Sequence, residues 1–250
     1  MGSTTATPLA EECAKKFSEI RPNCSVNVCG GGSTIGLDGI VENGYDIAMS
    51  SRQITDEELL KYETVEKRFN EYLVGYDGIC VVLNERVYDE GVTKLSIEQL
   101  RQIYSNEIRN WKDIDGPDHE IYFLSRKPGS GTRVIFDQFI MGLKNADYTD
   151  LGSEIGGNAE VVSLVADSNW AIGYVGYSYV EDNGMMFIPL DGVALTLDNI
   201  TCGSYPLARN LYFYTFGFPT PCADAFIKFV TGTEGQKIAK DIEIAPITPL

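Results

Sequence analysis

Strand-like and helix-like segments alternate along almost the whole chain, and this order limits the fold more than any other feature of the sequence. Apolar residues recur at helical spacing over 8–20, with Leu9 and Phe17 on one face, whereas 73–83 contains the apolar run Ile79–Leu83 that is typical of a buried strand. Further helices are expected over 35–41, 56–73, 96–104, 134–140 and 222–230 and from 233, and further strands over 25–29, 46–49, 121–124, 171–175 and 211–215. Strands that alternate with helices predict an α/β fold with mostly parallel sheets.

The length and charge of the chain exclude several classes of protein. Its 250 residues suffice for two units of roughly 100 to 150 residues each. No stretch reaches the ~18 uninterrupted apolar residues that cross a membrane. Lys and Arg number 20 against 36 Asp and Glu, which gives a formal net charge of −16. Because binding to nucleic acid depends on a basic face, we expect no nucleic-acid partner.

The six cysteines and the single histidine do not form a metal-binding pattern. The sequence has no C-x-x-C pair, and His119 alone is no nitrogen-rich ligand set, so we expect no metal site. His119 also lies in the polar stretch 116–120, a turn that argues against a catalytic triad. Cys13 falls on an apolar helix face and Cys80 in an apolar strand, so buried thiols are the first expectation and one or two disulfides the second.

Three loops share one design, in which a strand ends, a segment rich in Gly, Ser and Thr turns, and a helix begins. They are Ser3-Thr4-Thr5, Gly32-Ser33-Thr34 and Gly129-Ser130-Gly131-Thr132. Each exposes backbone N–H groups at the positive end of a helix, with hydroxyl donors beside them. Since ligands of α/β sheets collect at the carboxyl ends of strands, these loops predict an anion site.

Arg126 stands four residues before Ser130, and its planar fork matches a tetrahedral oxyanion. Serine, threonine and glycine are also common at helix starts for purely structural reasons, so each loop alone is a weak signal. The third loop lacks the Lys-Ser/Thr ending of a P-loop, and no G-x-G-x-x-G with an acidic partner occurs. Nucleotide hydrolysis is therefore disfavoured.

Two motifs are specific when they occur together: Gly30-Gly31-Gly32-Ser33, and Arg-x-x-Gly-Ser-Gly-Thr at 126–132. With the segments 2–17, 30–59, 76–84, 107–121, 125–140, 171–180, 205–215 and 225–238, in this order, they resemble the phosphate-binding protein of bacterial and archaeal phosphate ABC transporters. The resemblance implies a two-lobed periplasmic-binding-protein-like fold of type II, with one phosphate in the cleft between the lobes and closure about a hinge. Lobe one is then expected at 1–78 and 206–250, lobe two at 79–205, and the hinge strands near 75–83 and 204–215.

The resemblance also implies the ligands of the phosphate. Carried over by motif, Ser33, Arg126, Ser130, Gly131 and Thr132 hold phosphate oxygens, and the loop of Ser3, Thr4 and Thr5 supplies further donors. No cofactor is implied besides the bound phosphate.

The chain departs from the family pattern at Ser51, where some members carry an aspartate that accepts the proton of hydrogen phosphate. Ser51 still offers a hydroxyl donor. Asp77, in a predicted hinge strand, either replaces the missing carboxylate or is a turn aspartate. Selectivity for phosphate over sulfate depends on which of these roles Asp77 has.

The sequence thus predicts an extracytoplasmic solute-binding protein that captures inorganic phosphate and delivers it to a membrane ABC permease. We expect a monomer that is periplasmic or on the cell surface, where a lipid anchor is one possibility, and that is not an enzyme. Two alternatives stay open: a receptor for another tetrahedral oxyanion such as sulfate, and a phosphoesterase that uses Ser33 or Ser130 as its nucleophile. A sensor module that uses the same closure cannot be separated from a transport receptor by sequence.

Overall fold

The structure is a computed structural model that describes residues 1–143, 146–148, 152–180 and 185–248. The chain divides into two compact units, which we call unit 1 (1–77 and 209–250) and unit 2 (78–208). The chain passes from one unit to the other twice, within strand β2 (Phe69–Asn84) and at the start of strand β7 (Ala208–Phe216).

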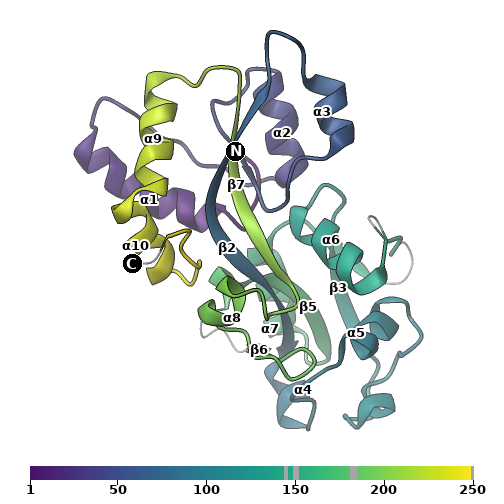
Figure 1. Cartoon of the computed structure of the whole chain (residues 1–250). Helices are drawn as coiled ribbons and strands as arrows, with labels where there is room; N and C mark the ends of the chain where they lie inside the picture. The colour runs from purple at the N-terminus through teal and green to yellow at the C-terminus, as the bar shows by residue number, and fades with distance from the viewer. Residues whose placement is uncertain (144–145, 149–151, 181–184, 249–250) are drawn as a thin grey trace. The chain divides into compact units, whose positions relative to one another are not determined.

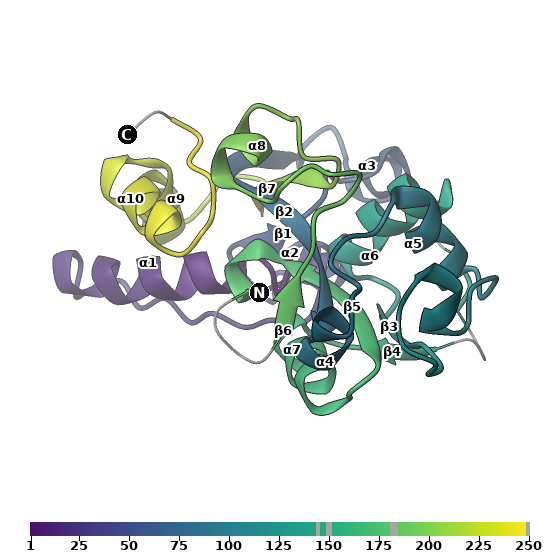
Figure 2. The ribbon, with the colours of Figure 1, turned by 90° about the horizontal axis from the view of Figure 1, so that it is seen from below.

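Unit 1 combines a small sheet with helices from both ends of the chain. Strand β1 (Ala48–Ser50) pairs antiparallel with β7, and β7 neighbours β2. Figures 1 and 2 both show helices α9 and α10, in yellow, beside α1. The helices of this unit are α1 (Thr7–Ile20), α2 (Ser33–Val41), α3 (Asp56–Tyr62), α9 (Pro221–Thr231) and α10 (Thr233–Asp241).

The core of unit 1 joins residues that are far apart in the sequence. Leu9 and Phe17 of α1 pack with Phe213 of β7 and with Phe226 and Val230 of α9, all of them buried. Phe17 meets Phe226 edge to face, with ring centroids 5.3 Å apart. The apolar face that the sequence predicts for 8–20 is therefore the face that α1 turns to this core.

A disulfide joins Cys24 to Cys222 at the start of α9. One disulfide agrees with the second expectation for the cysteines, and this bridge closes a loop across 198 residues of sequence and lies beside the core of unit 1. Cys13 is a buried thiol as expected, and burial raises its pKa to about 12. Cys80 is also buried, whereas Cys29 and Cys202 are exposed.

Unit 2 contains a mixed sheet in the order β2-β5-β3-β4, and β6 pairs with β2 outside this order. Strands β3 and β4 and strands β3 and β5 run parallel, while β5 and β6 run antiparallel to β2. Figure 2 shows these strands together, and α7 packs on β5. The elements are α4 (Glu85–Asp89), α5 (Ile97–Tyr104), η1 (Trp111–Ile114), β3 (Tyr122–Arg126), α6 (Gly131–Phe136), η2 (Asp137–Met141), β4 (Ser153–Ile155), α7 (Asn158–Asp167), β5 (Ala171–Gly176), η3 (Tyr177–Tyr179), β6 (Met185–Phe187) and α8 (Leu197–Thr201).

Three predictions of local structure differ from the fold. The helix expected over 56–73 ends at Tyr62, because Thr64 accepts the N–H groups of Glu66 and Lys67 in a turn, and β2 begins at Phe69. Residues 25–29 form no strand, although Gly30 makes a bridge with Gly2. The sheets are mixed where mostly parallel pairing was expected, since β2 and β7 run antiparallel to neighbours.

In the parts of the chain that the structure describes, no helix combines the length and the apolar character needed to span a membrane. Nor do three or more His, Cys, Asp or Glu side chains cluster, among the described residues, in a way that could hold a metal ion. The single histidine, His119, stacks on Trp170 with ring centroids 3.8 Å apart.

Candidate anion-binding site

The first loop of unit 1 is held by the backbone of two neighbouring segments. The N–H of Gly2 donates to the carbonyl of Cys29 (3.0 Å), and the N–H of Ser3 donates to that of Met49 (2.8 Å). The Ser3 hydroxyl is then used in the turn itself, where it accepts from the N–H of Thr5 (3.2 Å). Thr4 is half-buried, with its methyl group against Gly30.

The second loop places Ser33 at the first position of α2. Gly32 precedes it with φ of 111°, a conformation that side-chain-bearing residues rarely adopt, and this explains why the loop needs glycine there. Ser33 is fully buried, and its Oγ accepts from the backbone N–H of Ser51 (3.2 Å). The structure therefore brings Ser33 and Ser51 together, although 18 positions separate them in sequence.

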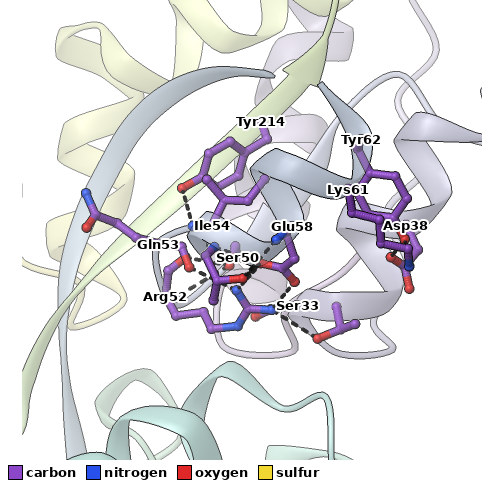
Figure 3. A network of polar contacts seen from close by, with 12 residues as sticks. Ser33, Asp38, Ser50, Arg52, Gln53, Ile54, Glu58, Lys61, Tyr62 and Tyr214 are labelled. Atoms are coloured by element: carbon purple, nitrogen blue, oxygen red, sulfur yellow. Dashed lines mark hydrogen bonds and ion pairs between the residues drawn. The ribbon is translucent and has the colours of Figure 1, made fainter. Parts of the chain in front are cut away.

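The segment that follows β1, from Ser51 to Thr55, forms another polar loop of unit 1, which is drawn in Figure 3. Arg52 is 6% exposed, and it donates from Nη1 and Nη2 to the two carboxylate oxygens of Glu58 (2.8 and 2.6 Å). Nη2 also donates to Thr34 Oγ1 (3.1 Å). One side chain thus ties this loop to the starts of α2 and α3. Glu58 completes a capping box with Thr55.

The electrostatics of this loop follow from burial and pairing. Burial raises the pKa of the Glu58 carboxyl, but the hydrogen bonds from Arg52 and Thr55, together with the charge of Arg52, outweigh it, so the pKa lies below its ordinary value. Beside this pair, Ser51 is 1% exposed, and among the described residues its Oγ has no hydrogen-bond partner. A buried hydroxyl without a partner costs about 1–3 kcal/mol, which a polar ligand would recover.

A second polar group in unit 1 contains Thr5 and Asp77. Both are fully buried, and Arg209, which is 6% exposed, joins them. Arg209 donates from Nε and Nη2 to Asp77 Oδ2 (2.9 and 2.7 Å) and from Nη2 to Thr5 Oγ1 (3.0 Å). Asp77 of β2 is therefore part of a buried ion pair with Arg209 of β7. Sequence reasoning missed Arg209, because 132 positions separate it from Asp77.

In unit 2, Arg126 is the last residue of β3 and is 1% exposed. Its Nη1 donates to Asn158 Oδ1 (2.6 Å), its Nη2 to the carbonyl of Gly156 (2.9 Å) and its Nε to that of Ile155 (3.4 Å). Its backbone N–H donates to the hydroxyl of Tyr174 (3.2 Å). These neutral acceptors hold the plane of the guanidinium. Asn158 was also missed, since no motif marks it.

The Gly-Ser-Gly-Thr loop follows Arg126 and starts α6. Gly129 has φ of 87°, and Ser130 is the N-cap residue, whose Oγ accepts from the N–H of Arg133 (3.3 Å). Gly131 and Thr132 are buried in the first turn. The expected design of strand, glycine loop and helix is thus present.

Arg133 fastens this loop to the rest of unit 2. Its Nη1 donates to the carbonyl of Arg126 (2.7 Å) and to Glu154, and its Nη2 donates to the carbonyl of Ala146 (2.6 Å). Its Nε contacts Asp137 (3.4 Å). Burial raises the pKa of the Asp137 carboxyl, against the opposing effects of its hydrogen bonds and of the Arg133 charge.

The ten residues expected to bind the anion therefore divide between the units. Unit 1 carries Ser3, Thr4, Thr5, Ser33, Ser51 and Asp77, and unit 2 carries Arg126, Ser130, Gly131 and Thr132. Direct contacts join Ser33 to Ser51 and Ser3 to Thr5, and Arg209 links Thr5 to Asp77. A cavity of about 280 Å³ in unit 1, lined by residues such as Met1, Val26 and Phe226, includes none of the ten.

Comparison with known proteins finds relatives that match almost the whole chain. The family model of a PBP superfamily domain matches residues 1–234. The phosphate-binding protein PstS of Bacillus subtilis is 30% identical over 250 residues, which cover 100% of this chain and 80% of that protein. The protein of the same name from Borreliella burgdorferi is 27% identical over 249 residues, covering 96% and 86%.

Solved structures agree with these relatives. A structure with bound phosphate, assigned to a phosphate ABC transporter substrate-binding protein of Clostridium perfringens, has a TM-score of 0.88 at 29% identity and covers 99% of this chain and 98% of that one. An ABC-type phosphate transport receptor from Vibrio cholerae has a TM-score of 0.76 at 27% identity, with the same coverage of 99% and 98%.

Proposed function

The chain belongs to the PBP superfamily and, within it, to the phosphate-binding proteins of ABC transporters, and we propose on this premise that it captures inorganic phosphate and delivers it to an ABC permease. The observation that carries the proposal is the whole-chain match to the Clostridium perfringens structure, which holds phosphate. The polar groups of each unit supply what a tetrahedral oxyanion requires, namely hydroxyl donors and a guanidinium fork.

The proposed phosphate ligands are the ten residues expected from the sequence. Ser51 has the strongest support in unit 1, because its hydroxyl is buried without a partner among the described residues. Arg126 has the strongest support in unit 2, since neutral acceptors hold its charged fork in one orientation. Asp77, as a buried carboxylate, is the proposed acceptor for the proton of hydrogen phosphate.

We propose that the protein binds phosphate without chemistry on it. A phosphoesterase would need a base that activates Ser33 or Ser130. The Ser33 hydroxyl instead accepts a hydrogen bond from the N–H of Ser51, and that of Ser130 accepts from the N–H of Arg133. His119 lies in a surface turn, where its ring stacks on Trp170, and none of these contacts joins it to Ser33 or Ser130.

Location and assembly are also part of the proposal. A disulfide such as Cys24–Cys222 forms and persists in oxidising compartments, which supports an extracytoplasmic location. A net charge of −16 disfavours nucleic acid and leaves the membrane permease as the macromolecular partner. We propose a monomer.

The test uses equilibrium binding of radiolabelled phosphate to the whole chain, together with an assay for hydrolysis of a generic phosphate ester. We expect one phosphate per chain and no turnover of the ester. Arg126→Ala should abolish most of the affinity while the circular dichroism spectrum stays unchanged. Turnover of the ester would support the phosphoesterase, and full affinity in Arg126→Ala would remove Arg126 from the site.

A further inference from the structure

Strands β2 and β7 each carry a buried charge at the point where the chain crosses between the units. Asp77 is the last residue of unit 1 on β2, and Arg209 is the first residue of unit 1 on β7. Two nitrogen atoms of Arg209 donate to the same oxygen, Asp77 Oδ2, at 2.9 and 2.7 Å. The pair is deeply buried, with side chains 2% and 0% exposed.

The same guanidinium also fixes a hydroxyl from the first loop. Arg209 Nη2 donates to Thr5 Oγ1 at 3.0 Å, and Thr5 is fully buried. A hydroxyl that accepts from a cation turns its own proton away from that cation, so this contact restricts the directions in which the Thr5 hydroxyl can donate. One arginine therefore orients both a hydroxyl donor and a carboxylate acceptor.

A hydroxyl and a carboxylate side by side match the hydrogen-bonding pattern of hydrogen phosphate better than that of sulfate. Hydrogen phosphate has oxygen atoms that accept and one O–H that donates, whereas sulfate at neutral pH has only acceptors. Beside a fixed carboxylate, an oxygen of sulfate meets a second acceptor and a like charge. A protonated oxygen of phosphate instead forms a charge-assisted hydrogen bond.

We propose that Arg209 is the positioning residue that sets selectivity for phosphate over sulfate, by holding the Asp77 carboxylate and the Thr5 hydroxyl in their orientations. The inference rests on the proposed function, since it names how the same site chooses its ligand. Lysine cannot replace Arg209, because a single ammonium lacks the planar fork that reaches Asp77 and Thr5 at the same time.

A purely structural ion pair is the competing explanation, because removing one partner of a buried pair also destabilises a protein. The two explanations differ in what they affect. A structural role alters the midpoint of unfolding and lowers the affinities for both anions by similar factors. A positioning role changes the ratio of the two affinities.

The experiment titrates the whole chain with phosphate and with sulfate in a calorimeter, for the wild type, Arg209→Lys, Asp77→Asn and the double variant Asp77→Asn/Arg209→Met. The double variant leaves no unpaired buried charge, so it keeps the test available if Arg209→Lys fails to fold. Arg101→Lys, which makes the same exchange in an exposed ion pair with Glu98, is the control.

We expect the ratio of phosphate to sulfate affinity to fall at least 10-fold in Arg209→Lys and in Asp77→Asn. The double variant should lose no more selectivity than Asp77→Asn, because a Thr5 hydroxyl donor serves both anions alike and Arg209 changes the ratio of their affinities only through Asp77. An unchanged ratio in Asp77→Asn or in Arg209→Lys, or a double variant with much lower selectivity than Asp77→Asn, would overturn the inference.

The wild type separates this inference from the proposed function. If the wild type binds phosphate, the proposed function stands. The ratios of phosphate to sulfate affinity in the variants then decide only the role of Arg209. A wild type that binds both anions equally overturns the selectivity role while anion capture remains. A wild type that binds neither anion overturns the proposed function itself, and the inference with it.

Discussion

Arg126 Nη1 donates to Asn158 Oδ1 across 2.6 Å, so a buried guanidinium at the end of β3 is oriented by a neutral amide at the start of α7. An amide fixes the direction of the fork without adding a negative charge beside it. A carboxylate in the same place would orient the fork equally well, but it would also repel an incoming anion.

Asn158→Asp is therefore expected to weaken phosphate binding about 10-fold or more, equivalent to ~1.4 kcal/mol. The new carboxylate forms an ion pair with Arg126, so the midpoint of thermal unfolding should not fall. Calorimetric titration measures the affinity. Asn23→Asp makes the same charge change at an exposed position and should leave the affinity near that of the wild type. Equal affinities for both variants would show that the charge next to Arg126 does not matter.

Ser51→Ala is expected to lower phosphate affinity by roughly 10- to 100-fold, because it removes a hydrogen bond to a charged ligand. The unliganded protein should keep or gain stability in urea unfolding, since the hydroxyl that is lost has no partner among the described residues. Ser178→Ala is the matched control, because its Oγ is also buried without a described partner. Phosphate affinity that falls in Ser178→Ala as much as in Ser51→Ala would argue against a specific role for Ser51.

The Arg52–Glu58 pair predicts a dependence of stability on pH. The pKa of Glu58 in the folded state lies below its pKa in the unfolded state. The ionised Glu58 carboxylate therefore stabilises the folded protein fully above the ordinary pKa near 4.5, and this stabilisation is lost as the pH falls through the lowered pKa. Asp137 has a raised pKa and acts in the opposite direction, with stability lost as the pH rises through that value. Comparison with Glu58→Gln isolates the first effect, because both proteins keep Asp137.

Glu58→Gln should cost roughly 3 kcal/mol of unfolding free energy at pH 7, since it leaves Arg52 buried without its carboxylate. The difference in unfolding free energy between the wild type and Glu58→Gln should shrink as the pH is lowered below about 4.5. Urea unfolding followed from pH 3 to 7 measures it. A difference that stays constant across this range would contradict the assignment of the lowered pKa to Glu58.

The disulfide Cys24–Cys222 is expected to stabilise unit 1. Cys24→Ser/Cys222→Ser should lower the unfolding free energy by about 2–5 kcal/mol, because the bridge closes a loop across 198 residues of the unfolded chain. A reducing agent should destabilise the wild type and leave the double variant unaffected, and Cys202→Ser, at an exposed thiol, should behave as the wild type. No effect of reductant on the wild type would contradict a contribution from the bridge.

The sequence predicted the local parts of this structure well. The helix expected over 96–104 is α5, and the apolar face of 8–20 is the buried face of α1. These features follow from neighbouring residues in the chain, which is where spacing and capping rules apply. The end of α3 was missed because the turn at Thr64 competes with helical spacing through its side chain.

Contacts between distant positions could not be read from one sequence. Nothing near Asp77 marks Arg209 as its partner, and nothing near Cys24 marks Cys222. Asn158 looks like any polar residue at a helix start, yet it holds Arg126 from 32 positions away. Most of the proposed anion ligands carry a motif, whereas Asn158 and Arg209, which contact two of them, are brought there only by the fold.

The most direct test of the account is a calorimetric titration of the wild-type chain, unfolded and refolded to remove bound ligand, with phosphate and then with sulfate between about pH 5 and 8. The account predicts one tightly bound phosphate per chain and a much weaker affinity for sulfate. Absence of phosphate binding to the refolded protein would contradict it, and the polar loops at Ser33 and Ser130 would then have a structural role alone.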